Sequence, residues 1–325
     1  MRLRFLSMLV AMRLRWASKL PMFNHTKKRG ASMRLRFLSM FVAMSVAGVA
    51  NAAAPTWEDG TTQFNKTFTA SGTVVGKEFM NDWEWAVGTG LQGLQGALSQ
   101  ATTTNGNKVT ITVPTLTPIL VGRTRKAIQS PFPETDNLGV GSTPHIAFTS
   151  DGRSVKLTGE GEEWEAKGKA YLDITVKDAN TSSKIGTARL HLTYVGVAGE
   201  VDLKTNKSIM YSLFAKDNNA IFLGGLPTNV GASEFRSGSA AVAMTEKFGG
   251  LSKQELLKQL DIQQFTTITE DSSNYEFLVA GFKVAATYAL GFQPNQTIDV
   301  TFEQGKAPTS TTPWTASLGI QVTYV

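Results

Sequence analysis

The 325-residue sequence contains no cysteine and only three histidines. Without cysteine the chain cannot form disulfides, thiol nucleophiles or thiolate metal sites. Neither His145 nor His191 stands in a Gly-x-Ser-x-Gly or His-Glu-x-x-His motif. His191 alternates with Leu190 and Leu192 as in a strand, so we interpret it as a structural or solvent-facing histidine. We therefore expect no catalytic residue, no metal and no cofactor, although this evidence alone leaves Ser-His chemistry open.

Basic residues are scarce once the first 52 positions are set aside. Residues 1–52 hold ten of the 32 Lys and Arg residues and none of the 26 Asp and Glu residues. The remaining chain therefore has 22 basic and 26 acidic side chains, a net charge of −4, although the whole sequence carries +6. This balance argues against nucleic acid as a partner.

The N-terminus carries a repeated, basic and apolar segment. Residues 1–12 and 33–44 are identical at all but one position. The second copy begins a signal peptide over 33–52, with an apolar run too short to span a membrane and a small-residue cleavage site at 50–52. We interpret residues 1–32 as a duplicated or mis-started leader, which leaves open whether Met1 or Met33 is the true start.

A strand pattern follows close after this signal, over residues 64–75. Its apolar face consists of Phe64, Phe68 and Ala70, interrupted by Lys66 and Gly72. Full burial of each phenylalanine side chain is favoured over exposure to water by about 1.5–3 kcal/mol, so such a strand does not stay free in water. The stretch is either the first strand of the chain's own sandwich or a strand donated to an open sheet edge of another copy.

Alternating apolar segments recur through the rest of the chain and predict a mostly β fold. Trp83 and Trp85 would bury two indoles on one face of a strand. Other strands are expected over 108–113, 119–121, 145–149, 154–157, 169–177, 188–195, 277–290, 297–302 and 316–325.

Residues 200–265 depart from this strand pattern. An Ala-rich helix is expected over 239–248 because Gly249 follows as a C-terminal stop. A second helix is expected after Ser252, which forms a capping box with Glu255. We interpret the region as a small two-helix insertion in a loop of the sandwich, where function is often placed.

The final strand alternates regularly up to the end of the sequence. One face consists of Leu318, Ile320, Val322 and Tyr324, opposite Gly319, Gln321 and Thr323. No later segment follows to cover its edge, and an open edge aggregates unless another strand pairs with it. One end of the chain thus offers a spare strand, and the other end a strand that lacks a neighbour.

Two clusters of polar residues are candidates for a binding site or for chemistry. Glu160, Glu162, Glu163 and Glu165 crowd a Gly-rich turn, which keeps a secreted carbohydrate-active β-sandwich enzyme open as an alternative, although a solvated acidic turn fits better. The residues from Tyr211 onward combine aromatic faces with polar groups, as a sugar site requires. The candidate carbohydrate-binding residues are Tyr211, Phe214, Lys216, Asp217, Asn218 and Asn219. The competing interpretation places both aromatics in the core and makes 216–219 an ordinary polar turn, which leaves the site unassigned. If the site lies elsewhere, the expected location is 232–236.

Several sequence blocks, taken in order, resemble the Fae-type major fimbrial subunits of enterobacterial chaperone–usher pili. These blocks are Phe64-Asn65 with the strand after it, Trp83–Leu91, Pro118–Thr124, Ser212–Phe214, Ala220–Gly225, Ser237–Ala241 and the terminal strand with Tyr324. The resemblance implies an incomplete immunoglobulin-like β-sandwich, spanning 76–325, that is completed by a donor strand from a neighbouring subunit. The donor extension would then lie within 53–75.

The resemblance also implies a set of partners. A periplasmic chaperone would lend a strand to the terminal edge during export, an outer-membrane usher would receive the subunit, and the next identical subunit would replace the chaperone. The resulting fimbria would lie on the bacterial surface, where its major subunit also acts as the adhesin and binds host-cell glycans through the 200–265 insertion. A minor subunit of the same fimbria is the alternative.

Overall fold

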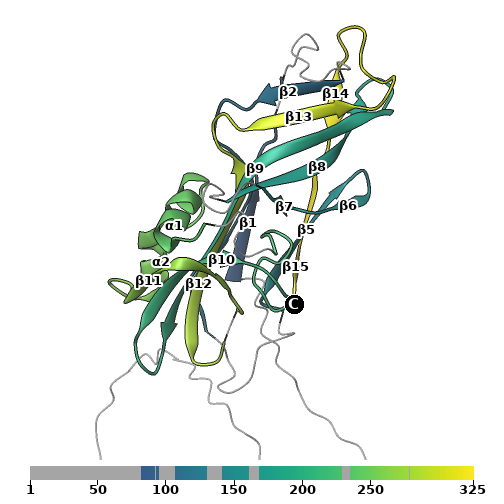
Figure 1. Ribbon diagram of the computed structural model, residues 1–325. Coiled ribbons are helices and arrows are strands. Elements are labelled where there is room, and N and C mark those ends of the chain that lie inside the picture. Colours follow the sequence, from purple (N-terminus) through teal and green to yellow (C-terminus); the bar gives the residue numbers. More distant parts are fainter. Residues whose placement is uncertain are drawn as a thin grey trace, which may run out of the picture. The chain divides into compact units, whose positions relative to one another are not determined.

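The computed structural model describes residues 82–91, 93–94, 107–129, 141–160, 168–228, 235–277 and 279–325 (Figure 1). All of them belong to one compact unit, Gly72–Val325. The expected leader, signal peptide and donor stretch, including Phe64, Phe68 and Ala70, lie outside the described residues.

The larger of two sheets is built around an unusually long strand, β9 (Lys184–Asp202). Its main path runs in the order β1 (Trp83–Val87), β3 (Thr117–Thr124), β12 (Phe282–Phe292), β9, β10 (Ser208–Phe214) and β11 (Thr267–Asn274). Neighbours along this path are antiparallel except for β10 and β11, which are parallel. In Figure 1 the strand β9 runs the length of this sheet.

The first half of β9 has different neighbours from the second half. Its neighbours there are β8 (Lys169–Asp178) and β13 (Thr297–Phe302). Two short strands, β7 (Thr158–Gly159) and β14 (Trp314–Ala316), pair with β8. Strand β2 (Lys108–Thr112) pairs with β13, and β4 (Ile128–Gln129) pairs with β12. The residues of β8 alternate between buried and partly exposed, which is the period-2 pattern that predicted this strand.

A smaller sheet carries the C-terminus. Its order is β15 (Gly319–Tyr324), β5 (Pro144–Ser150) and β6 (Arg153–Val155), all antiparallel. Ile146 and Phe148 of β5 are buried in the same core as Leu192 and Tyr288 of the larger sheet. The architecture is therefore a mostly β, incomplete immunoglobulin-like sandwich, as the sequence predicted.

Two helices cover the outer face of the larger sheet, α1 (Gly238–Lys247) and α2 (Lys253–Leu260). They bury a second apolar cluster that includes Leu256 of α2 and Val197 of β9. The predicted capping box is present, since the Ser252 hydroxyl accepts from the Glu255 amide and the Ser252 amide donates to the Glu255 carboxylate at 2.8 Å. Among the described residues, no helix has the length and apolar character needed to cross a membrane.

Several element boundaries differ from expectation. The strand expected over 188–195 continues to Asp202, because Gly196 and Gly199 stay within it and make room for Leu226 and Phe265 packed closely above them. The region 200–265 is accordingly less irregular than predicted, since it contains the end of β9 and all of β10. The strand expected over 277–290 begins only at 282.

The expected single strand 316–325 is instead two strands. β14 pairs with β8 in the larger sheet, and β15 pairs with β5 in the smaller one. Ser317 and Leu318 lie between them, where the chain changes from one sheet to the other. The C-terminal segment therefore connects both layers of the sandwich.

Candidate functional site: an apolar groove and a polar turn

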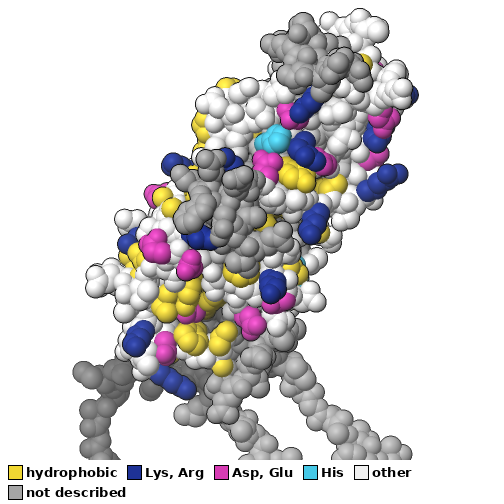
Figure 2. Space-filling view, viewed as in Figure 1, with side chains coloured by type: hydrophobic (Ala, Val, Ile, Leu, Met, Phe, Trp, Pro, Cys, Tyr) yellow, Lys and Arg dark blue, Asp and Glu magenta, His cyan; other side chains and the backbone are white. Residues whose placement is uncertain are grey.

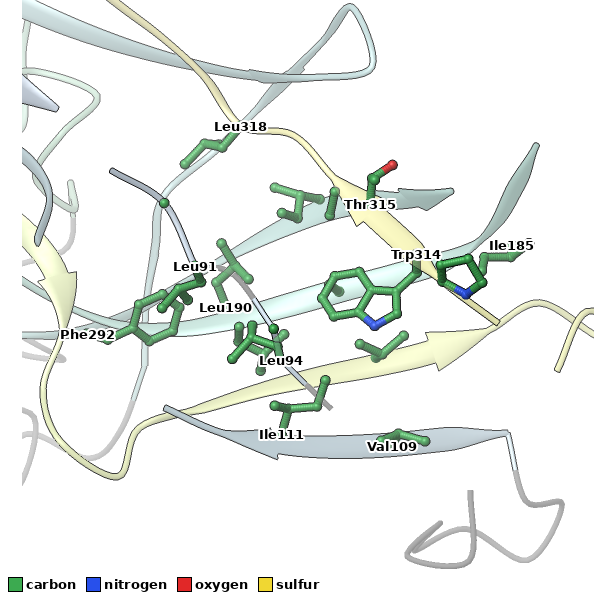
Figure 3. Close-up of a pocket in the computed structure, with 18 of the residues that line it drawn as sticks. Leu91, Leu94, Val109, Ile111, Ile185, Leu190, Phe292, Trp314, Thr315 and Leu318 are labelled. Carbon is green, nitrogen blue, oxygen red and sulfur yellow. The ribbon is translucent and has the colours of Figure 1, made fainter. Parts of the chain in front are cut away.

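An apolar groove of about 1070 Å³ runs beside the C-terminal segment (Figure 3). One wall consists of Trp314 and Ala316 of β14 with Leu318 and Ile320 near the start of β15. Beyond the groove, Val322 and Tyr324 continue the same half-buried face of β15, while Gly319, Gln321 and Thr323 are exposed. The four residues predicted to form the terminal apolar face thus all point inward.

The other edge of this C-terminal wall has no partner among the described strands. β14 pairs only with β8, and β15 lies at the end of its sheet with β5 as its single neighbour. A strand has the backbone N–H and C=O groups of both its edges satisfied only when another strand pairs with it on each side. The groove therefore lies next to an open strand edge.

The floor of the groove consists of branched apolar side chains from three strands. They are Val109 and Ile111 of β2, Ile298 and Val300 of β13, and Leu190 of β9, all nearly fully buried. Because successive residues of a strand face opposite sides, the neighbours of these residues lie on the outer face of the sheet. The floor and the outer surface are thus two faces of the same three strands.

The outer face behind the floor carries a charged network centred on His191. Its Nδ1 atom lies 3.0 Å from Glu160 Oε1, and its Nε2 atom lies 3.3 Å from Asp299 Oδ2. Lys108 Nζ lies 2.8 Å from Asp299 on the same face. The hydrogen bond to Glu160 raises the pKa of His191 above its ordinary value, against the lowering effect of partial burial. His191 thus links β9 to β13 and to the residue that follows β7.

From the sequence, Glu160 is expected to lie in a solvated acidic turn. Its carboxylate is instead hydrogen-bonded to His191. Glu162, Glu163 and Glu165 lie outside the described residues. On the face in view in Figure 2, acidic and basic side chains are interspersed rather than gathered by sign.

An aromatic cluster connects β1 to the C-terminal strand. The rings of Trp83 and Trp85 stack at 6.1 Å, and Phe222 meets both edge-on. Trp85 Nε1 donates to the hydroxyl of Tyr324 at 2.9 Å. The burial of two indoles on one face of β1 was predicted, whereas their bond to the terminal strand was not.

The structure does not bring Tyr211 and Phe214 together. They stand three residues apart on β10, so their side chains lie on opposite faces of the strand. The hydroxyl of Tyr211 donates to Glu200 at 2.9 Å, and Tyr275 donates to the same carboxylate. Tyr211 therefore has an internal partner, whereas Phe214 is half-buried and belongs to neither apolar cluster.

The polar turn, residues 216–219, follows Phe214 directly. Lys216, Asp217 and Asn218 are exposed, and Asn219 is half-buried. Asp217 accepts from the Asn219 amide at 3.1 Å, which closes the turn. The groups that could contact a sugar rim are thus presented together beside one partly exposed aromatic ring.

Two residues that sequence reasoning missed hold this turn in place. The side chain of Asn274 accepts from the Lys216 amide at 2.7 Å and donates to Asp217 at 2.9 Å. His145 hydrogen-bonds to the backbone of Asn218, and burial lowers the pKa of this histidine. Both contacts are remote in the sequence, and no local pattern indicates them. Of the alternative location at 232–236, only Phe235 and Arg236 are described, and Phe235 is buried.

Comparisons with known proteins give a context for the apolar groove and the polar turn. The family described as "Fimbrial, major and minor subunit" matches residues 36–325. This chain belongs to that family. It is 38% identical to K88 fimbrial protein AD of Escherichia coli over 284 residues, which cover 86% of this chain and 96% of the relative. K88 fimbrial proteins AB and AC of Escherichia coli match over the same length at 38% and 37% identity.

Membership in this family makes the chain a fimbrial subunit, a structural component of a surface fimbria. The groove and the open edge of β14 and β15 are thus features of a protein that forms part of a fimbria. A fimbria is a polymer of subunits, so each subunit needs surfaces that join it to its neighbours.

Proposed function

We propose that this fimbrial subunit polymerises by donating residues 64–75 to the groove of the next copy. The observation that carries the proposal is the apolar groove beside the unpaired edge of β14 and β15. A strand added there would pair its backbone with that edge and place Phe64, Phe68 and Ala70 on the apolar floor. Backbone pairing supplies the attachment, and the alternate side chains supply the specificity.

A subunit with this groove uncovered is prone to aggregate. Its open edge and its apolar floor both invite non-specific pairing. A periplasmic chaperone would cover the β14–β15 edge until an outer-membrane usher brings the next subunit. The major-subunit role follows if every copy both donates and accepts a strand, and the abundance of the chain in sheared fimbriae distinguishes it from a minor subunit.

Removal of residues 53–70 tests the polymer directly. The truncated chain should still accumulate with its chaperone, since the groove is intact, but it should not add to a growing fimbria. Phe68→Asp should have the same effect, because a buried unpaired charge costs several kcal/mol. The neighbouring position, on the polar side of the predicted strand pattern, supplies a control, since Thr67→Asp keeps the charge off the apolar face. Ordinary fimbriae from the truncated chain would refute the donor role.

We also place the glycan contacts of an adhesive subunit at Phe214 and the polar turn. A half-exposed ring beside an ammonium, a carboxylate and an amide matches the flat faces and hydroxyl rim of a sugar. Tyr211 contributes less directly, since its hydroxyl is bound to Glu200. Asn274 and His145 hold the turn in the shape that a ligand would meet.

Glycan binding by three variants tests this location. Phe214→Ala and Asp217→Ala should each weaken binding to host-cell glycoconjugates by about tenfold, the effect of losing about 1.4 kcal/mol of contact energy. Tyr211→Phe is the matched control, because it removes only the internally bonded hydroxyl and should leave binding unchanged. Thermal unfolding must stay unchanged in all three. Full binding by both alanine variants would move the site elsewhere.

The carbohydrate-active enzyme is the weaker alternative. Of its four candidate carboxylates only Glu160 is described, and it is bound to His191 on the outer face of the sheet behind the groove. The family is one of structural subunits. Hydrolysis of a glycan by the purified protein, abolished by Glu162→Gln or Glu163→Gln, would reverse this order of preference.

A further inference from the structure

The groove is not empty along its whole length. Leu91 and Leu94 reach into it from a stretch of chain that belongs to no strand (Figure 3). Both are half-buried and packed against the main apolar cluster, between the floor and the β14 wall. Part of the space that a second copy's strand would enter is therefore already filled by leucine side chains.

Two glycines shape the backbone that carries Leu91 and Leu94. The β1 ladder to β3 ends where the Gly88 amide donates to Ile119, and the chain then leaves the sheet. Gly90 and Gly93 have φ angles of 82° and 68°, in the left-handed region that favours glycine. Leu91 and Leu94 each follow one of these glycines directly, and both line the groove.

The donor stretch has a matching size pattern. Its inward positions are large at Phe64, Lys66 and Phe68 and small at Ala70 and Gly72. A groove that is open at one end and partly filled at the other accepts such a strand in one register only. A shift by two residues would bring Phe68 against the leucines, and overpacking of that kind is destabilising.

We propose that Leu91 and Leu94 set the register of the donated strand, by admitting only the small side chains of Ala70 and Gly72 opposite them. The inference rests on the proposed donor function and adds the residues that give it specificity. The antiparallel arrangement, the commoner one, would place these later positions beside β14 and the phenylalanines beside β15. The occupant is the N-terminal extension of a second copy of this chain.

A size exchange tests the proposal in the full chain, expressed in cells that assemble the fimbria. Ala70→Leu should lower the yield of sheared fimbriae by about tenfold, the scale of a steric clash in a packed core. Adding Leu94→Ala to Ala70→Leu should restore the yield. The soluble periplasmic subunit is measured in parallel, so loss of folding is separated from loss of assembly. Leu91→Ala is combined with Ala70→Leu as well, and it decides the question if Leu94→Ala does not fold.

The matched control removes a similar volume elsewhere in the groove. Ile320→Ala lies on the β15 wall, and it should not rescue Ala70→Leu. Normal assembly by Ala70→Leu alone, no rescue by either folded leucine variant, or equal rescue by Ile320→Ala would each overturn the proposal. Phe68→Asp separates this result from the parent proposal. If it abolishes assembly while Ala70→Leu assembles normally, the donor function stands and only the register inference fails.

Discussion

His191 illustrates how one side chain can hold several strands together. Glu160, directly after β7, and Asp299 of β13 flank its two ring nitrogens, and both carboxylates favour the protonated ring. The folded-state pKa is raised above the ordinary 6.5. Its stabilisation is therefore complete below that value and is lost as the pH rises through the raised folded pKa.

Replacement of this histidine gives a pH-dependent prediction. His191→Gln should lower the free energy of unfolding most at about pH 5.5, and the difference from the parent protein should shrink toward about pH 8.5. Chemical denaturation across this range measures it. His145→Gln is the control with the opposite sign, since burial lowers the pKa of His145 and its neutral form is favoured. A His191→Gln effect that stays flat or grows with pH would contradict the assigned network.

Phe222 is a residue whose conformation the sequence could not reveal. Its φ angle is 62°, unusual for a bulky side chain, yet it is fully buried. Its ring packs against Trp83, Trp85 and Tyr288, three residues far away in the sequence. The packing of the whole aromatic cluster compensates this strained backbone conformation, which the local sequence does not predict.

At the scale of elements, the C-terminal segment connects the two layers and forms a wall of the groove. Its alternation was predictable, because the period of a strand is visible in a short stretch of sequence. Its division into β14 and β15 was not, since the division depends on which partner strands lie beside it. The same limit explains the length of β9, whose Gly196 and Gly199 allow close packing by distant residues.

The alternation of β15 yields a prediction about the unassembled subunit. Val322→Lys should reduce periplasmic accumulation severalfold, because the charge would point onto the half-buried apolar face. Thr323→Lys introduces the same charge on the exposed face and should leave accumulation unchanged. Immunoblots of periplasmic extracts measure both. Equal loss in the two variants would mean that exposure along β15 does not govern accumulation.

The polar turn shows both what sequence reasoning could find and what it missed. The aromatic and polar groups from Phe214 to Asn219 are contiguous, so they were visible as a cluster. The parity of Tyr211 and Phe214 on a strand was also available, and it places them on opposite faces. Asn274 and His145 could not be found, because only the packing of distant segments brings them to the turn.

At the scale of the whole molecule, the described residues form a sandwich in which the β14–β15 edge is unpaired beside an apolar groove. The chain also carries an apolar strand pattern over residues 64–75. In a fimbrial subunit these two features are complementary. We propose that the strand of one copy binds the groove of another copy, and not the groove of its own chain.

Engineered cysteines test this claim most directly, because the chain has none of its own. In an added strand, the polar positions Asn65, Thr67, Thr69 and Ser71 would lie on the same outer face as Gln321. Neighbouring positions on paired strands come within disulfide range. Each tail position is therefore changed to cysteine in turn, together with Gln321→Cys, and fimbriae are oxidised and separated in detergent without reductant. Lys204→Cys, in the β9–β10 turn away from the groove, replaces Gln321→Cys in the control.

The account predicts that one tail position, paired with Gln321→Cys, gives a detergent-resistant ladder of covalently joined subunits that reductant abolishes. The Lys204→Cys control should give only monomers. A cross-linked monomer without a ladder would show that residues 64–75 complete their own sandwich. That result, or no cross-link at any tail position, would contradict the donation of this strand between copies.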